Sequence, residues 1–338
     1  MPTISTWSSI CAVSEGWATL AVQPMIMHVM AGLMVDDLGR VLLAERPAGK
    51  HLAGFWEFPG GKVEPDESRL DALSRELREE LGIELQSATP LIRVPWKYRD
   101  RTVLLDAWRV DRWLGTPQSM ERQALRWCEP QQIDPAIMTP ADRPILQALR
   151  LPDEYAITPA DVRPDQRDEW FERITQAIRR KPCLIQLRLP LWSADGVRQF
   201  ATDLLPAARE HRSQLLLHAD IEGAVALGVG VHLTSAQLSK LSERPLPWQQ
   251  LVGVSCHDAA QLGRATDITA DFATLSQVAS ADSHDGQCAM DWGSFRSMAE
   301  AAALPVFARG GMRPSLAVKS KMHAGQGVAG VEAFWARK

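Results

Sequence analysis

The chain has 338 residues, 46% of them hydrophobic, which is enough for two domains with cores of their own. Lys and Arg number 37 against 41 Asp and Glu, a formal net charge of −4, so we expect no nucleic-acid polymer as partner and only a local site for small anions. The five cysteines are scattered and odd in number, which favours a reducing cytoplasm, and no apolar run is long enough to predict a membrane span.

The first segment, residues 1–24, carries no basic start and has Glu15 in the middle of its only apolar stretch. This pattern argues against a signal peptide. We therefore expect a loosely attached, disordered leader, with Met25 or Met27 as an equally good start of translation.

Two strands, 28–35 and 41–47, are predicted next, followed by a glycine-rich loop and a helix over 68–81. The leucines of this helix recur at spacings of three and four, which predicts one apolar face: Leu70, Leu73, Leu77 and Leu81. Gly82 is placed to end the helix. Strands near 91–96 and 102–110 and a helix over 141–150 complete a first domain of residues 25–150.

A polar, proline-bearing stretch that begins at Leu151 predicts the domain boundary. Beyond it, within a second domain of residues 151–338, short apolar strands alternate with helix-length segments. Eight strands in so short a chain predict a TIM (β/α)₈ barrel with its ligand site at the C-terminal strand ends. These strands are 155–158, 184–188, 214–218, 230–233, 251–255, 271–275, 305–308 and 327–331.

Three glutamates of the 68–81 helix, Glu76, Glu79 and Glu80, stand at positions i, i+3 and i+4. Their carboxylates converge on one face and repel one another unless a cation lies between them. Mg²⁺ prefers oxygen ligands of this kind and bridges them to phosphates. The alternative, a solvated acidic face, is the usual explanation for a glutamate cluster.

The segments Gly61–Glu67 and Arg75–Ile83 decide between these alternatives. Together they resemble the Nudix box, G-x5-E-x7-R-E-U-x-E-E-x-G-U, at every fixed position. The resemblance implies an α/β/α sandwich with a mixed sheet and a hydrolase that uses Mg²⁺, with Mn²⁺ as a substitute. It implies the catalytic residues Arg75, Glu76, Glu79 and Glu80, with Glu76 as the candidate general base. It implies metal ligands at Gly60, Glu76, Glu79, Glu80 and Glu121.

Residues 27–150 also resemble the MutT subfamily. The loop Glu57–Lys62 has the MutT form. The segment from Trp113 to Trp127 matches MutT without a gap, which places Glu121 where the family has a further metal-binding carboxylate from outside the helix. By this resemblance the substrate-binding residues are Arg46, His51, Glu57, Phe58, Pro59, Gly60, Arg101 and Asp142. Asp142 stands where MutT has the asparagine that contacts the oxidised purine, and an ionised Asp only accepts hydrogen bonds unless burial keeps it protonated.

The implied reaction is attack of water on a nucleoside triphosphate, giving a monophosphate and pyrophosphate. We expect 8-oxo-dGTP as substrate, hence a role in sanitation of the nucleotide pool and in DNA replication and repair. Hydrolysis of another diphosphate, such as a thiamine-pathway compound, is an alternative because of Asp142. A non-catalytic ligand sensor is a third hypothesis, but the acids of the box are intact. Nothing in the sequence sets an oligomeric state.

The second domain resembles the thiamine phosphate synthase/TenI family, and its fusion to the first resembles bacterial two-domain Nudix hydrolases. The matching segments, weaker than the Nudix box, include Ile185–Arg188, Val254–His257 and Ala308–Gly311. Candidate site residues are Gln186, Arg188, His257, Gly310 and Gly311. The synthase lysine and metal ligands are replaced by Pro190, His218-Ala219 and Gln237, which argues against synthase activity. His257 matches the proton-shuttling histidine of thiazole tautomerases; a purely structural polar residue is the alternative.

Overall fold

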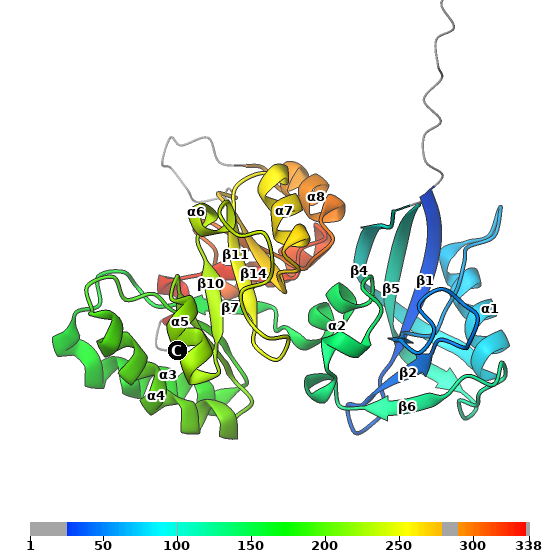
Figure 1. Ribbon diagram of the computed structural model, residues 1–338, viewed down its shortest axis with the longest axis horizontal. Helices are drawn as coiled ribbons and strands as arrows, with labels where there is room; N and C mark the ends of the chain where they lie inside the picture. The colour runs from blue at the N-terminus through cyan, green and yellow to red at the C-terminus, as the bar shows by residue number, and fades with distance from the viewer. Residues whose placement is uncertain (1–25, 100, 279–289, 336–338) are drawn as a thin grey trace, which may run out of the picture.

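The structure is a computed structural model that describes residues 26–99, 101–278 and 290–335. The leader predicted for residues 1–24 lies outside the described residues. The described chain forms two halves, one built on two three-stranded sheets and one on a barrel (Figure 1). No helix in this part of the chain is long and apolar enough to cross a bilayer.

The first half contains two three-stranded sheets. One has the order β1-β5-β4, in which β1 (Ile26–Met34) runs parallel to β5 (Thr102–Leu114) and β4 (Glu84–Lys97) runs antiparallel to it. The other has the order β3-β2-β6 and is antiparallel, with strands Trp56–Glu57, Val41–Glu45 and Leu125–Cys128. The mixed sheet predicted from the sequence is therefore confirmed.

Two helices cover opposite faces of these sheets because consecutive strand residues point to opposite sides. Met30 and Met34 of β1 pack in a cluster with the leucines of α1 (Arg69–Leu81). Ala31 and Leu33 pack in another with Ile145 of α2 (Arg143–Arg150). This arrangement is the predicted α/β/α sandwich.

The ends of α1 follow from its sequence. Ser68 caps the helix by accepting a hydrogen bond from the Asp71 backbone N–H at 3.2 Å. Gly82 ends it in the left-handed region at φ 67°, where a residue without a Cβ is favoured, and its N–H donates to Arg78. The acidic face therefore stands on a helix with fixed ends.

Four elements of the first half differ from the predicted ones. The strand expected at 91–96 extends over Glu84–Lys97, with bulges that shift its register. The strands β3 and β6 are additional. The helix expected from 141 begins at Arg143, because Pro144 fits only a first turn and the residues before it form a turn.

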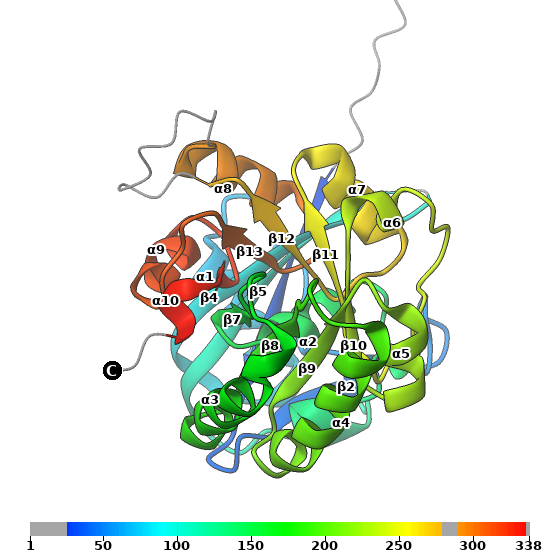
Figure 2. The ribbon, with the colours of Figure 1, turned by 90° about the vertical axis from the view of Figure 1, so that its left-hand side faces the viewer.

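The second half is a closed barrel of eight parallel strands, and every predicted strand is present. Helices surround the strands (Figure 2). The strands are β7 (Glu154–Ile157), β8 (Leu184–Leu187), β9 (Gln214–His218), β10 (Gly230–Leu233), β11 (Val252–Cys256), β12 (Phe272–Ser276), β13 (Val306–Arg309) and β14 (Gly327–Gly330). The helices are α3 (Arg167–Arg180), α4 (Ala194–Glu210), α5 (Ile221–Leu227), α6 (Ser235–Leu238), α7 (Ala259–Asp267), α8 (Trp292–Ala301), α9 (Ala317–Met322) and α10 (Glu332–Trp335).

The barrel interior is apolar on one level and polar on the next. Tyr155, Phe272 and Phe307 are fully buried and pack edge to face or tilted against one another. Nearer the C-terminal strand ends, Gln186 donates to the Nδ1 atom of His218 at 2.8 Å. The polar groups of the barrel thus gather toward the end at which TIM barrels bind ligands.

Candidate functional site

A cavity of about 860 Å³ opens in the sandwich half. Its walls come from β1, the loops around residues 46–64, α1, the β4–β5 turn and the start of α2. The cavity brings together all the substrate, catalytic and metal residues predicted for this half except Pro59. The Pro59 carbonyl instead accepts the N–H of Gly32 at 2.8 Å and holds the glycine loop against β1.

Glu80 is the most enclosed carboxylate of the acidic face. The N–H of Gly60 donates to its Oε2 atom at 3.0 Å. Burial, together with the charges of Glu57, Glu121 and Glu76, raises the pKa of Glu80 to about 8 in spite of the Gly60 hydrogen bond, which lowers it. Negative charge is therefore concentrated where α1 faces the glycine loop.

Arg75 ties the acidic helix to the loop before it. Its Nε and Nη2 atoms donate to the two oxygens of Glu67, each at 2.9 Å, and Nη2 also donates to the Lys62 carbonyl at 2.9 Å. Its Nη1 atom donates to Glu76 at 2.9 Å and to Glu79 at 3.3 Å. Arg75, predicted to be catalytic, thus has its guanidinium nitrogens engaged by the protein, and one of these bonds holds the Glu76 carboxylate.

The predicted metal ligands lie around one cavity, but they do not form a ready coordination shell. Among the described residues, no three acidic, histidine or cysteine side chains are grouped closely enough to hold a metal ion. Glu79 is largely exposed and paired with Arg75, and Glu121 pairs with Lys50 at 3.4 Å. Lys50 is exposed, so Glu121 can exchange this partner for a metal, and the exposed Glu79 can turn away from its 3.3 Å contact with the fixed Arg75.

The donor chemistry of the site fits a hard divalent cation. The mutual repulsion that raises the pKa of Glu80 is relieved by a cation among the carboxylates. The loop comes close to them: a Cβ on Gly61 would stand 2.3 Å from the Glu76 carboxyl group. Gly61 and Pro59 use their carbonyls in hydrogen bonds to β1, and the Gly60 carbonyl between them takes no part in this ladder.

Aromatic and basic side chains form the wall between the acidic face and α2. Arg46 forms an ion pair with Glu57, and its Nε atom donates to the His51 carbonyl at 2.7 Å. The Tyr98 ring contacts the His51 ring edge-on, with centroids 5.7 Å apart, and lies under the Arg101 guanidinium at 5.7 Å. A flat, electron-rich ring with cations beside it can stack on a nucleobase and contact phosphates.

Asp142 lies at the far end of the same cavity and is buried, with 3% of its surface exposed. The Thr139 hydroxyl donates to Oδ2, and the Phe58 N–H donates to Oδ1 at 3.4 Å. Burial, together with the charge of Glu57, raises the pKa of Asp142 from 3.8 to about 7. The carboxyl group is therefore partly protonated near neutrality and can then donate a hydrogen bond.

Several residues that line the cavity were not predicted as site residues, and among them are the polar side chains of Lys50, Tyr98 and Thr139. Thr139 stands three residues before Asp142, a spacing typical of side-chain capping ahead of a helix, and this signal was available. Tyr98 and Lys50 lie in turns without periodicity, so only the folded chain brings them to the cavity.

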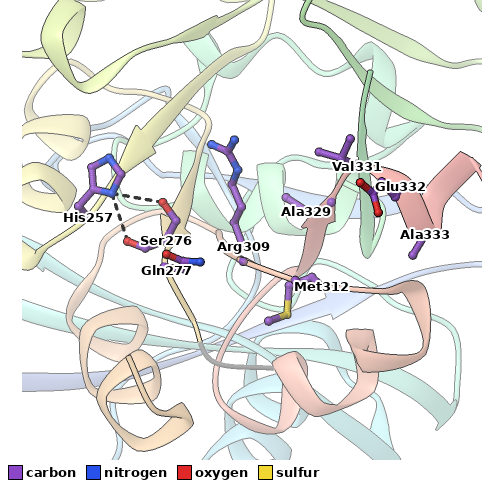
Figure 3. Close-up of a pocket in the computed structure, with 12 residues that line it drawn as sticks. His257, Ser276, Gln277, Arg309, Met312, Ala329, Val331, Glu332 and Ala333 are labelled. Carbon is purple, nitrogen blue, oxygen red and sulfur yellow. Dashed lines mark hydrogen bonds between the residues drawn. The ribbon is translucent and has the colours of Figure 1, made fainter. Parts of the chain in front are cut away.

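A second cavity, of about 640 Å³, lies at the C-terminal end of the barrel strands. It brings together the predicted residues His257, Gly310 and Gly311, with Ser276 and Arg309 beside them (Figure 3). The Nδ1 atom of His257 lies 3.2 Å from both the hydroxyl and the carbonyl oxygen of Ser276. Ser276 and Arg309 were not among the predicted site residues.

The other two barrel candidates, Gln186 and Arg188, do not line this cavity. Gln186 is buried and bonded to His218, and the backbone N–H of Arg188 donates to Thr158 at 2.7 Å. Burial, together with the charges of Arg188 and Arg309, lowers the pKa of His218 to about 4. The Nδ1 atom of this imidazole is taken by Gln186, and the two nearby guanidinium charges disfavour a divalent cation here.

The two halves match two family models. A model described as NUDIX domain matches residues 30–148, and one described as thiamine monophosphate synthase matches residues 154–334. The chain therefore belongs to the Nudix family through its first half and to the thiamine monophosphate synthase family through its barrel. The Nudix half makes it a hydrolase that acts on phosphoric anhydrides.

Particular relatives cover the first half. The CTP pyrophosphohydrolase of Escherichia coli (strain K12) is 46% identical over 124 residues, which are 37% of this chain and 91% of that relative. An 8-oxo-dGTP diphosphatase of Proteus vulgaris is 42% identical over 87 residues, 26% of this chain and 78% of that relative. For the barrel, a solved thiamine phosphate pyrophosphorylase from Pyrococcus furiosus has a TM-score of 0.44 and 17% identity, over 57% of this chain and 91% of that one.

Proposed function

We propose that residues 25–150 are a cytoplasmic, Mg²⁺-dependent nucleoside triphosphate pyrophosphohydrolase that converts 8-oxo-dGTP to 8-oxo-dGMP and pyrophosphate, and that residues 151–338 are a separate barrel domain. One observation carries this proposal. A single cavity has the acidic face of α1 at one end and the buried, protonatable Asp142 at the other. This is the layout that a nucleotide with a phosphate chain and a base to be recognised requires.

The chain's own residues supply most of the chemistry. Glu76, Glu79, Glu80, Glu121 and the Gly60 carbonyl would hold the cation. When bound, Mg²⁺ neutralises the phosphate oxygens and activates a water. Glu76, which Arg75 holds at 2.9 Å, is oriented to accept the proton of the attacking water. The N–H of Gly60 holds Glu80 by donating a hydrogen bond to its carboxylate.

Asp142 supports recognition of an oxidised purine in spite of its departure from asparagine. In its protonated form it donates to a carbonyl oxygen such as O6, and its other oxygen accepts from an N–H such as N7–H. Near pH 7 both forms are populated, because burial raises its pKa to about 7. The identity of 46% to a CTP pyrophosphohydrolase makes CTP the second candidate substrate.

The test is pyrophosphate release by the full chain with Mg²⁺ and equal concentrations of 8-oxo-dGTP, dGTP, CTP and thiamine diphosphate. Preference for 8-oxo-dGTP supports the proposal, whereas faster turnover of CTP or thiamine diphosphate would leave a hydrolase with a different substrate. Without any turnover, the first half would be a binding module.

Glu80→Gln is the matching inactive variant. Because it removes the most enclosed carboxylate of the metal set, we expect turnover to fall by about 10³-fold. Glu84→Gln, on the exposed start of β4, is the control and keeps full activity. Full activity of Glu80→Gln would refute the metal assignment.

The barrel is not proposed as a synthase. One position expected to bind a metal holds Ala219, which offers no side-chain ligand, and the neighbouring His218 is neutral and hydrogen-bonded to Gln186. Departure of a diphosphate needs charge stabilisation of the kind that those missing carboxylates and their metal provide. A tautomerase activity through His257 stays a hypothesis, supported by the position of this side chain at the barrel cavity.

A further inference from the structure

Helix α2 is the element that connects the proposed nucleotide site to the barrel. Its first turn follows directly on Asp142, which lines the nucleotide cavity. In Figure 1 the helix lies on the side of the sandwich half that faces the barrel. The polar contacts of α2 therefore show what holds Asp142 in place.

The barrel binds α2 at its beginning. The Arg143 guanidinium lies over the Trp248 ring at 4.6 Å, and the Arg244 guanidinium lies over the same ring at 4.7 Å. Arg244 is itself fixed by backbone carbonyls and by Asp271, to which it donates at 2.7 Å. Trp248 is thus a platform held by the barrel for the first residue of the helix.

The barrel also binds the middle of α2. Gln147 is buried, and its Nε2 atom donates to Asp271 at 2.9 Å. Asp271 is buried as well, and its other oxygen accepts from Arg244 and from the Val252 N–H at 2.6 Å. This carboxylate cannot move without breaking bonds inside the barrel.

The end of α2 is capped by the barrel. The Nε2 atom of Gln326 donates to the carbonyls of Ala148 and Leu151 at 3.2 and 2.9 Å, where a helix has unsatisfied acceptors. On the apolar side, Ala303 of the barrel belongs to the same buried cluster as Ile145. Beginning, middle and end of the helix are all tied to the second half.

The contacting barrel residues share one location. Trp248, Asp271, Ala303 and Gln326 all stand in segments that lead into strands, before β11, β12, β13 and β14 respectively. These four residues therefore lie at the N-terminal end of the barrel strands, the end that stabilises a TIM fold. The cavity with His257 lies at the C-terminal end of the strands. The nucleotide site is therefore supported by the barrel without sharing its ligand cavity.

We propose that the barrel is a scaffold for base recognition: Gln147 and Trp248 are positioning residues that hold α2, and through it Asp142, in register with the nucleotide cavity. This inference rests on the proposed function, because it assigns Asp142 to the base. The acidic face stands on α1, outside these contacts, so loosening α2 should weaken base binding and leave metal binding unchanged.

The variants are Gln147→Leu, which removes the bond to Asp271 while Arg244 still neutralises that carboxylate, and Trp248→Ala, which removes the platform for Arg143. Trp248→Phe keeps an aromatic face and should rescue. Gln249→Ala is the matched control, since exposed Gln249 donates its hydrogen bond to Asp134 of the other half, at 3.4 Å, a residue outside α2. Trp248 is only half-buried, so its variant keeps the test open if Gln147→Leu does not fold.

The measurement is equilibrium titration of the full chain with 8-oxo-dGMP, dGMP and CMP, together with KM and kcat for the matching triphosphates. Misplacement of a recognition group by about 1 Å can cost up to 100-fold, and for a loosened helix end we expect about tenfold weaker monophosphate binding. KM rises in parallel, while kcat and the Mg²⁺ midpoint stay the same. Unaltered affinities in both variants would overturn the inference.

The titration needs no turnover, so it separates the two proposals. Absence of hydrolysis by the wild-type chain would refute the proposed reaction, and the variants would still report on positioning. A fall in kcat and in metal affinity together with nucleotide affinity, in Trp248→Phe as well, would show general damage to the fold and overturn a specific role.

Discussion

The substitution Asp142→Asn tests whether burial keeps this carboxyl group protonated. The side chain accepts hydrogen bonds from Thr139 and Phe58, and burial raises its pKa from 3.8 to about 7. An asparagine of the same shape carries a permanent amide donor and no charge. The variant should therefore behave like the protonated wild type at every pH.

The size of the effect on the free energy of unfolding follows from the pKa shift of Asp142. At about 1.4 kcal/mol per pKa unit, a rise from 3.8 to about 7 destabilises the ionised folded state by roughly 4 kcal/mol. Because the folded-state pKa of Asp142 is the higher one, the folded chain binds more protons than the unfolded chain between these pH values. The stabilisation from this group is complete below pH 3.8 and is lost as the pH rises through about 7.

Two assays follow. Thermal unfolding of the wild type and Asp142→Asn at pH 5 and pH 8 should show the variant gaining stability relative to the wild type at the higher pH. KM for 8-oxo-dGTP should rise above pH 7 in the wild type, as the donor on Asp142 is lost, and stay level in the variant. Parallel pH profiles for the two proteins, in either assay, would refute a protonated Asp142.

Two further predictions concern the acidic face. Because the pKa of Glu80 is raised to about 8, protons compete with Mg²⁺ below that pH, so the Mg²⁺ concentration for half-maximal turnover should fall about fivefold from pH 7 to pH 8. A pH-independent midpoint would contradict this. Arg75→Lys cannot make the paired bonds to Glu67 and still hold Glu76, so kcat should fall about tenfold with KM unchanged. Arg78→Lys, on the exposed side of α1, is its control, and equal kcat in both variants would argue against positioning by Arg75.

The sequence predicted the elements whose signals are local. The leucine spacing and Gly82 specify α1, because helix periodicity and a left-handed cap depend on neighbouring residues alone. The eight barrel strands were equally readable as short apolar runs. The predicted range of β4 misses residues 84–90, which end in Pro90, a residue that disfavours a strand. Pro90 and Pro95 are both tolerated because β4 lies at the edge of its sheet.

The residues of the candidate site also fall into two groups, those that the sequence predicted and those that only the fold brings to the cavity. The acidic face of α1 could be predicted from i, i+3 and i+4 spacing, and the resemblance to a family added the residues that come to the cavity from outside the helix. Tyr98 and Lys50 could not be predicted, since turns bring them to the cavity. The engagement of Arg75 with Glu67 was also hidden, because it depends on how the loop folds back onto the helix.

By itself the sequence determined the two folds and the class of reaction, because hydrophobic period, helix caps and a fixed motif act over short distances along the chain. Tertiary structure alone decided the protonation state of Asp142, because its pKa depends on burial and on the charge of Glu57, which is distant in the sequence. It also decided that the barrel fastens α2 through residues such as Asp271. Burial and contact between distant segments are properties of the packed molecule, and no local pattern encodes them.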